Sequence, residues 1–547
     1  MSGTPKAAAQ PELTQRQRQI LKLLQAGKVN KEVARELDIG VGTVKQHIVA
    51  LFKKLNVTNR AMAVSRGMDM LHGQENHGAK LNVDGLLERR PCVVLSMALP
   101  EDANHLAVKL MHGTLVALAS ANDAVFLARK GNAGDVIFGI QRVTEYDLAI
   151  ALQTARSVYD DLLSADAGMA EKMRGCLTAG LAIASMKRFG GWTGEAIASA
   201  VIASARELLN DTPPGCLAFD SATLDLIDVF GIGGSQEVAP VMAFPTLKKL
   251  HWTGSRRAYS LYGRADELAT LDAAMSEAAK GYGGLIHVEG EMGMGKTRLC
   301  DEVLQHCLRL GGEAKYFRCL PAVLGKGLYD NGKCANCTVE EVAARLSAKP
   351  VCSPELVIVD DFHLLPREQQ ELLSAAGTEA VGIGKLVIFA GRRGVIGSGS
   401  HPAESINLRR LSAEAIRALV CESLGKDAAK AGASEVQDIS STAAGVPLFA
   451  VELARHHDVG RLALPLLVVV TARLDGLSLD RNLLRTVARN PATTVEDIAE
   501  TLGEVAESLR QQVERATAAG VLSRSADGYL SFTHPLLRRA IDCLVME

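Results

Sequence analysis

The sequence GEMGMGKT at residues 290–297 constrains the fold of this 547-residue chain more than any other stretch. A short apolar, β-prone run at residues 285–288 precedes it, and a run with helical periodicity at residues 298–310 follows it. A strand that turns through glycines into a helix places backbone N–H groups around a concavity and directs the helix N-terminus towards an anion. The stretch therefore predicts a cradle for the phosphates of a nucleoside triphosphate. The alternative is a glycine-rich turn without a ligand.

The residues of this stretch have distinct predicted roles in the cradle. Lys296 can reach the β- and γ-phosphates, and the Thr297 hydroxyl can ligate Mg²⁺. Glycine lets the backbone approach a phosphate closely, and three glycines are candidates for that contact: Gly290, Gly293 and Gly295. ATP or ADP with Mg²⁺ is thus the expected ligand.

Two further apolar runs, at residues 356–359 and 386–390, read as buried strands of the same parallel sheet. Carboxylates follow the first run: Asp360 would hold Mg²⁺ through water, and Asp361 would orient the attacking water. Two arginines follow the second run, Arg392 and Arg393. One of them could contact the γ-phosphate, and a solvated loop residue is the alternative.

The composition indicates several domains and an uneven distribution of charge. The length fits roughly three to five domains, and the net charge is −2 at pH 7. Residues 1–70 nevertheless hold twelve Lys and Arg against five Asp and Glu, so a basic head precedes a neutral or acidic body. No apolar run is long enough to span a bilayer, and the N-terminus has no signal-peptide core. We therefore expect a cytoplasmic protein with no membrane partner, whose eleven cysteines are reduced.

The basic head has the pattern of three short helices. The first ends at Gly27, the second covers residues 30–37, and a turn at residues 38–40 leads into the third at residues 42–55. Apolar residues of the third helix recur at i, i+4, i+7 and i+11, which marks one buried face. This arrangement predicts an all-α helix-turn-helix whose last helix enters the major groove of DNA.

The opposite face of that third helix is polar and basic. Six residues of the head are candidates for DNA contact: Lys31, Thr43, Lys45, Gln46, Val49 and Lys53. Lys45 and Gln46 can read base edges. Lys31, Thr43 and Lys53 are better placed for phosphates.

Residues 13–64 resemble a LuxR-type DNA-binding domain over their whole length. The matching stretches are LT, NKEVA, TVKQH and KLNVTNRA. The sequence departs from the family pattern at Gln17 and Gly40, and neither is a principal base-reading position. The resemblance implies binding to double-stranded DNA, and the alternative is a helical bundle that contacts proteins.

Residues 79–250 read as a ferredoxin-like α+β domain with the order βαββαβ. The expected strands lie at residues 92–98 and 176–185, with a hairpin formed by residues 114–118 and 124–128. The expected helices cover residues 103–111, 146–163 and 194–209.

This α+β segment is similar to the class III nucleotide cyclase homology domain. The family's two metal-binding Asp and its late-helix Asn and Arg fall about at these positions: Ser96 or Met97, Asp123 or Asp135, Ala198 and Ile202. With one carboxylate missing, a two-metal clamp has too few oxygen ligands, and without Asn and Arg nothing neutralises the transferring phosphate. The resemblance implies a degenerate domain kept for dimerisation or ligand sensing, and an active cyclase is the alternative.

The surroundings of the phosphate cradle are similar to STAND ATPases, the signal-transduction branch of the AAA-like P-loop proteins. Gly263 and Arg264 open the Gly-Arg-x-x-Glu-Leu element, and Pro447 ends the Gly-x-Pro element that packs near the nucleotide. The resemblance implies an α/β parallel-sheet ATPase with a helical lid over residues 251–460. Slow hydrolysis would then serve as a switch.

Residues 461–547 read as helical with a small β-wing at residues 520–532. The sequence LSFTHPLLRRAIDCLV resembles the end of the winged-helix domain that follows the ATPase in this family. Such a domain usually packs on the ATPase, and a second DNA-binding surface is the alternative. His534 is expected to be a structural hydrogen-bonding residue.

Four cysteines could be either structural thiols or ligands of a metal site: Cys319, Cys334, Cys337 and Cys352. The CANC sequence has the spacing of a metal knuckle, but a second CxxC pair is missing. Reduced structural thiols are the expectation, and zinc is the alternative.

Together these features predict an ATP-dependent transcription regulator whose nucleotide state controls assembly on double-stranded DNA. A homo-oligomer is expected, because one helix-turn-helix neutralises few phosphates and linked heads gain effective concentration. The inducer would be a small molecule or a protein. The alternatives are an active class III nucleotide cyclase regulated by the P-loop module, and a signalling scaffold.

Overall fold

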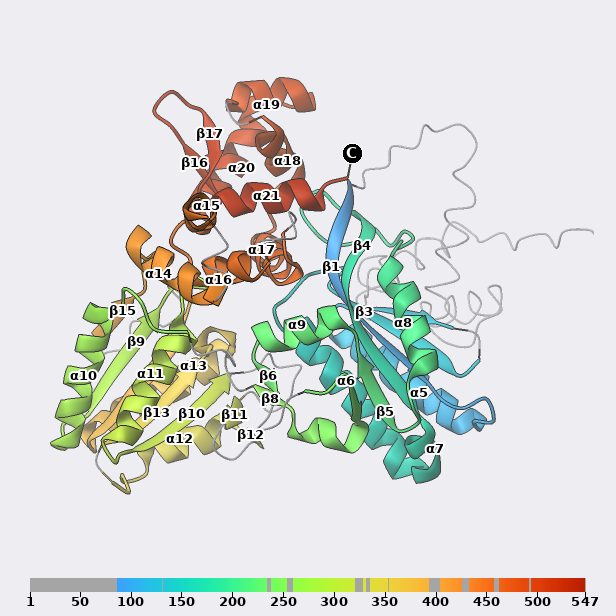
Figure 1. The fold of residues 1–547 in the computed structure, drawn as a ribbon, viewed down its shortest axis with the longest axis horizontal. Helices are drawn as coiled ribbons and strands as arrows, with labels where there is room; N and C mark the ends of the chain where they lie inside the picture. The colour runs from blue at the N-terminus through green and yellow to red at the C-terminus, as the bar shows by residue number, and fades with distance from the viewer. Residues whose placement is uncertain are drawn as a thin grey trace, which may run out of the picture. The chain divides into compact units, whose positions relative to one another are not determined.

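The computed structural model describes most of the chain from residue 86 onwards (Figure 1). The described ranges are 86–129, 131–233, 238–252, 259–319, 328–330, 335–352, 354–392, 404–425, 432–456, 462–490 and 493–546. Residues 85–547 form one compact unit, and residues 1–84 form another. The predicted helix-turn-helix and its candidate DNA contacts lie outside the described residues and stay predictions, at Lys31, Thr43, Lys45, Gln46, Val49 and Lys53.

The first sheet has six strands in the order β2-β3-β1-β4-β5-β7. Its strands are β1 (Leu86–Ala98), β2 (Val125–Ala128), β3 (Ala133–Phe138), β4 (Arg174–Met186), β5 (Cys216–Phe219) and β7 (Val241–Ala243). Its helices are α5 (His105–Ala121), α6 (Asp147–Ala165), α7 (Ala167–Lys172), α8 (Ala200–Asp211), α9 (Ser221–Val229) and the 3₁₀ helix η1 (Phe244–Lys249), and β6 (Ile232–Gly233) pairs with β8 (His251–Trp252). β1 is antiparallel to both β3 and β4, so the predicted βαββαβ order is present in β1, α5, β2, β3, α6 and β4.

The hairpin predicted from residues 114–118 and 124–128 is wrong. Residues 114–118 belong to α5, in which Ala107, Met111, Leu115 and Ala119 recur every four residues and are buried. That spacing is helical, and the β-branched residues between them do not outweigh it. β2 pairs instead with β3. The helix predicted at residues 194–209 begins only at Ala200, where the Ser199 hydroxyl caps its N-terminus.

The second sheet has seven strands in the order β12-β11-β10-β13-β14-β9-β15. Its strands are β9 (Gly284–Glu289), β10 (Glu313–Cys319), β11 (Leu328–Asp330), β12 (Ala335–Cys337), β13 (Glu355–Asp360), β14 (Lys385–Gly391) and β15 (Glu404–Asn407). Its helices are α10 (Ala265–Ala279), α11 (Lys296–Arg309), α12 (Val339–Ser347), α13 (Arg367–Gly382) and the 3₁₀ helix η3 (Phe362–Leu364). β10, β13, β14, β9 and β15 are parallel, and every residue of β13 and β14 is buried, as the apolar runs predicted.

The remaining described residues are mainly helical. They form α14 (Ala413–Leu424), α15 (Ala433–Ala443), α16 (Pro447–Arg455), α17 (Leu464–Leu477), α18 (Arg481–Arg489), α19 (Val495–Leu502), α20 (Ala506–Ala518), α21 (Pro535–Leu544) and a hairpin of β16 (Leu522–Arg524) and β17 (Leu530–Phe532). Among the described residues, no helix combines the length and apolar character needed to cross a membrane.

Helix α17 contributes to both major apolar cores. Its central sequence is apolar on all sides, which is typical of a helix buried between layers. Val468 packs into the core of the first sheet, whereas Val469 and Val470 pack into the core that contains the second sheet. The sheets are therefore joined by side chains of one helix.

A candidate nucleotide-binding cavity

The loop between β9 and α11 has the backbone conformation that its glycines predict. Gly295 caps α11 with φ of 89°, and Gly293 has φ of 78°, a region that side chains other than glycine rarely adopt. A Cβ atom at Gly293 would also lie 3.1 Å from Leu448 Cβ. The first turn of α16 is thus packed directly over the loop.

Lys296 is a buried lysine at the base of this loop. Its Nζ donates hydrogen bonds to the carbonyl oxygens of Gly290 at 2.9 Å and of Glu291 at 3.0 Å. Burial lowers the pKa of Lys296, while Asp361 and Asp360 act in the opposite direction. A buried ammonium gains from an anion at short range, and a bound phosphate would provide one.

Thr297 and Asp360 are joined at the start of α11 and the end of β13. The Thr297 hydroxyl donates to Asp360 Oδ2 at 2.7 Å, and the Tyr316 hydroxyl donates to the same oxygen at 2.7 Å. The Asp361 backbone N–H donates to Asp360 Oδ1 at 2.8 Å. A hydroxyl beside a fully buried carboxylate is the hard oxygen donor set that Mg²⁺ prefers, so these residues fit the metal that a nucleoside triphosphate carries.

The next residue, Asp361, has a left-handed backbone with φ of 55°. Its Oδ2 accepts a hydrogen bond from Arg318 Nε at 2.9 Å, and Arg318 is the last but one residue of the neighbouring parallel strand β10. A carboxylate and a guanidinium from adjacent strand ends therefore lie together at the carboxyl edge of the sheet, where ligands of open α/β sheets bind.

These groups surround a cavity of about 280 Å³. The loop contributes Gly293, Gly295, Lys296 and Thr297, and α16 covers it with Pro447 and Leu448. Pockets for small ligands typically start at about this size. The cavity therefore combines phosphate-binding groups with an apolar cover.

Most of the predicted nucleotide contacts line this cavity. The lining residues among them are Arg264, Gly293, Gly295, Lys296, Thr297, Asp361 and Pro447. Gly263, Gly290 and Asp360 lie behind that lining. Arg264 donates to the backbone oxygens of Met294 at 3.1 Å and Arg409 at 2.8 Å, so it joins the loop to the segment before α14.

The two predicted arginines are placed differently. Arg392 does not line the cavity, and its guanidinium pairs with Glu145 Oε1 at 3.1 Å. Arg393 lies outside the described residues. Three residues that sequence reasoning missed do line the cavity: Arg318, Glu145 and Tyr146. The position of Arg318 at a parallel strand end could have identified it, whereas Glu145 and Tyr146 come from the first sheet and carry no local sequence signal.

In the first sheet, the side chains at the cyclase-like positions contact other side chains of the same domain. Ser96 Oγ donates to Asp135 Oδ1 at 2.6 Å, and both side chains are fully buried. Arg129 and Arg206 pair with the Asp135 carboxylate at 3.2 and 3.4 Å. Ile202 is part of the apolar core on that face of the sheet.

The cysteines considered as possible zinc ligands differ in how deeply they are buried. Cys319 and Cys337 are buried in the apolar core with Phe317 and Leu328, and Cys352 is half-buried. Cys334 lies outside the described residues. Among the residues that the structure describes, no group of three or more His, Cys, Asp or Glu side chains is arranged to hold a metal ion.

Two segments of the chain match known families. Residues 260–388 match the family described as "AAA ATPase domain", and residues 11–66 match "Bacterial regulatory proteins, luxR family". The chain therefore combines a LuxR-type regulatory segment with an AAA ATPase segment.

Individual relatives match parts of the chain. The CsgBAC operon transcriptional regulatory protein of Escherichia coli is 49% identical over 59 residues, which are 11% of this chain and 27% of that protein. The HTH-type transcriptional regulator MalT of Vibrio cholerae is 40% identical over 67 residues, 12% of this chain and 7% of MalT. The uncharacterized protein R02095 of Rhizobium meliloti is 24% identical over 238 residues, 40% of this chain and 23% of that protein. The chain thus spans no more than about a quarter of the length of these relatives.

Solved structures show weaker similarity. The Thermotoga maritima RuvB variant T158V aligns with 50% of this chain and 92% of its own, at 18% identity and a TM-score of 0.30. The guanylyl cyclase Cya2 aligns with 28% of this chain and 87% of its own, at 15% identity and a TM-score of 0.23. At these TM-scores, a shared fold is not established.

Proposed function

We propose that the protein is an ATP-dependent, DNA-binding transcription regulator whose nucleotide state controls assembly and promoter binding. The observation that carries the proposal is the cavity lined by Lys296 and by Thr297, whose hydroxyl is hydrogen-bonded to Asp360, in a chain whose residues 11–66 match a family of regulatory proteins. Two of the named relatives are described as transcriptional regulators, which supports the DNA-binding part. The site of action would then be the bacterial cytoplasm.

In this proposal, the nucleotide binds with its phosphates on the loop at residues 290–297. Lys296 would contact the β- and γ-phosphates, and Thr297 and Asp360 would hold Mg²⁺, Asp360 through water. The metal supplies charge neutralisation of the phosphates. Asp361 orients the attacking water, and its contact with Arg318 fixes the carboxylate in that position. Slow hydrolysis then resets the switch.

We further propose four domains with the boundaries predicted from the sequence. They are the LuxR-type head (1–78), a degenerate cyclase-like domain (79–250), a STAND-type ATPase with a helical lid (251–460) and a winged helix (461–547). The lid corresponds to α14–α16, and the wing to the β16–β17 hairpin. Oligomerisation through the middle domains would join several basic heads, and the gain in effective concentration would convert weak single contacts into occupancy.

Recovery of genomic DNA fragments by the purified protein tests this proposal. The recovery is run in parallel with ADP and with a non-hydrolysable ATP analogue, at one fixed salt concentration. We expect a set of fragments enriched only with the ATP analogue. Equal recovery with both nucleotides would contradict control by nucleotide, and no recovery with either would contradict the DNA-binding role.

A further inference from the structure

A loop of the first sheet forms one wall of the nucleotide cavity. Between β3 and α6, residues 139–146 place Glu145 and Tyr146 in the same lining as Gly293, Gly295 and Lys296. The Glu145 carboxylate is 21% exposed, and its Oε1 pairs with Arg392 at 3.1 Å. A segment far outside the matched ATPase residues 260–388 therefore presents an acid to the site.

Glu145 lies in the field of the same cations that would bind a nucleotide. Burial raises the pKa of Glu145, whereas Arg392, Lys296 and Arg318 lower it. A nucleoside triphosphate on this loop directs its γ-phosphate towards the lysine. The γ-phosphate and the Glu145 carboxylate would then be two anions lining one cavity, both within the field of Lys296.

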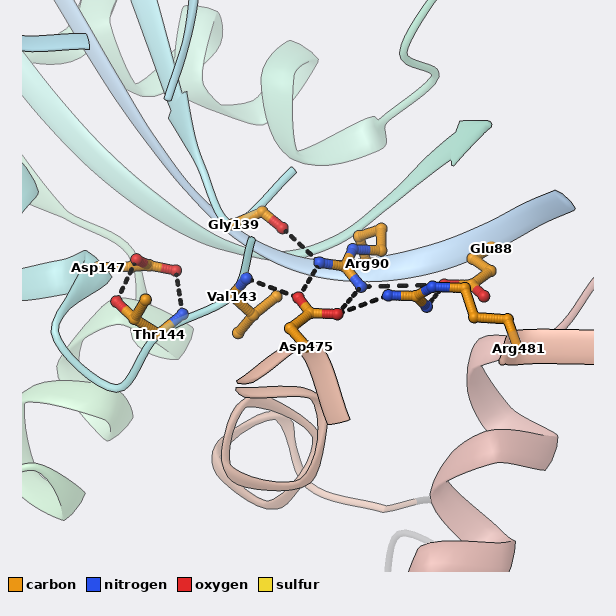
Figure 2. Close-up of polar contacts among 8 residues, drawn as sticks. All are labelled: Glu88, Arg90, Gly139, Val143, Thr144, Asp147, Asp475 and Arg481. Atoms are coloured by element: carbon orange, nitrogen blue, oxygen red, sulfur yellow. Dashed lines mark hydrogen bonds and ion pairs between the residues drawn. The ribbon is translucent and has the colours of Figure 1, made fainter. Parts of the chain in front are cut away.

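The loop that carries Glu145 is held at Gly139 and Val143 by one buried cluster of ion-paired side chains (Figure 2). Asp475 of α17 accepts a hydrogen bond from the Val143 backbone N–H at 2.8 Å and pairs with the fully buried Arg90 of β1. Arg90 NH2 also donates to the Gly139 carbonyl oxygen at 3.2 Å. Arg481 of α18 closes the cluster by pairing with Asp475 Oδ1 at 2.5 Å and with Glu88.

The rest of the loop is ordered by a turn that starts α6. Thr144 donates through its hydroxyl to Asp147 Oδ1 at 2.6 Å and through its backbone N–H to Oδ2 at 3.0 Å. Gly139 has φ of 90°, and a Cβ atom there would lie 2.4 Å from the Pro91 carbonyl oxygen. With anchors at Gly139, Val143 and Thr144, the loop has little freedom to withdraw Glu145 from the cavity.

We propose that Glu145 is a specificity residue of the nucleotide site, which disfavours the γ-phosphate and so sets the preference between ATP and ADP, and that Asp475 is its positioning residue. This inference rests on the proposed nucleotide binding at Lys296. A like charge held beside a ligand anion weakens binding.

Titration of the full-length protein with fluorescent ADP and a fluorescent non-hydrolysable ATP analogue, both with Mg²⁺, tests the proposal. Glu145→Gln keeps the shape and removes the charge, so we expect affinity for the ATP analogue to rise by about tenfold and affinity for ADP to change less than about twofold. The matched control is Glu368→Gln, a substitution at an exposed acid that lines no part of the cavity. Equal shifts for the two nucleotides, or no shift, would overturn the inference.

Two further variants separate the possible failures. If Lys296→Ala binds both nucleotides like the wild type, the proposed function fails. If Lys296→Ala loses binding while Glu145→Gln keeps the wild-type ratio of affinities, only the role of Glu145 fails.

The positioning role of Asp475 has its own measurement. Asp475→Asn should shift the ratio of ATP-analogue to ADP affinity in the same direction as Glu145→Gln, and the double variant should match Glu145→Gln alone. Additive shifts in the double variant, or a loss of both affinities without a change in their ratio, would overturn this role.

Discussion

Two buried aspartates, one in each sheet, both accept a hydrogen bond from a neighbouring hydroxyl but differ in the charged groups around them. Thr297 donates to Asp360 at 2.7 Å in the second sheet, and Ser96 donates to Asp135 at 2.6 Å in the first. Beside Asp360 lie a glycine-rich loop, Lys296 and an open cavity. Beside Asp135 lie two arginines that pair with its carboxylate.

The difference shows that a hydroxyl–carboxylate pair does not by itself define a metal or nucleotide site. At Asp360 the positive charge is on a lysine held by backbone carbonyls, so phosphate and metal oxygens can take over its contacts. At Asp135 two guanidinium groups already pair with the carboxylate. A metal cation would have to displace both of them. The first arrangement can receive a ligand, and the second stabilises the fold.

The largest expected effect comes from removing the lysine. Lys296→Ala should weaken ATP binding by at least about 100-fold, because charge-assisted hydrogen bonds to phosphate are lost in a buried site. Equilibrium titration with a fluorescent ATP analogue measures this. Lys280→Ala, at an exposed lysine, is the control and should bind like the wild type. If Lys296→Ala kept the wild-type affinity for the ATP analogue, the cavity beside Asp360 would not be the nucleotide site.

Matched substitutions at the two aspartates test the comparison directly. Asp360→Asn should weaken Mg²⁺-dependent nucleotide binding by about tenfold, as expected for a residue that holds a metal through water. Asp135→Asn should leave binding unchanged and lower the free energy of unfolding by about 1–2 kcal/mol, since the partly exposed Arg129 and Arg206 lose the charge that they pair with. Nucleotide titrations and urea unfolding midpoints of both variants measure these effects. A binding defect in Asp135→Asn would show that the first sheet also receives a ligand.

A third buried aspartate, Asp147, extends the comparison. Its direct hydrogen-bond partner is the neutral Thr144. Burial raises the pKa of Asp147 to about 7, above its value of 3.8 in the unfolded chain. The folded state therefore binds the extra proton, and the stability that this proton provides is lost as pH rises through 7. Asp147→Asn removes the titration, so its unfolding free energy relative to the wild type should rise by about 1–2 kcal/mol between pH 5.5 and pH 8.5. Urea unfolding at the two pH values measures the change, and a fall instead of a rise would contradict the burial of a protonated Asp147.

The smallest expected effect is the rate of cyclic nucleotide formation by the protein. Cyclic nucleotide formation from ATP or GTP with Mn²⁺ should stay at the level of a reaction without protein, because Arg129 and Arg206 occupy the Asp135 carboxylate and Ser96 supplies no charge. Mass spectrometry of the products measures it. Product that disappears in Asp135→Asn would assign catalysis to the first sheet.

Local sequence predicted the strand, glycine turn and helix around residues 284–309, because each of these features is encoded within a few residues. Glycines at positions of positive φ, an apolar strand before them and a helix after them lie in one continuous stretch. Apolar runs also identified β13 and β14, whose residues are all buried.

The remaining parts of the site depend on contacts between distant segments. Glu145 reaches the cavity only because α17 links the two cores and Asp475 holds the loop at Val143, and no sequence spacing predicts that contact. The misassigned hairpin has a local cause, since Thr114 and Val116 favour strands while the four-residue spacing of buried positions makes α5 a helix.

The most direct test of the account measures affinity for one recovered DNA fragment at fixed salt, with the ATP analogue and with ADP. We expect wild-type protein to bind the fragment about tenfold more tightly with the ATP analogue, a typical coupling between two ligands, and Lys296→Ala to show no difference between the nucleotides. Equal wild-type affinity with both nucleotides would contradict the claim that the nucleotide state of the cavity controls DNA binding.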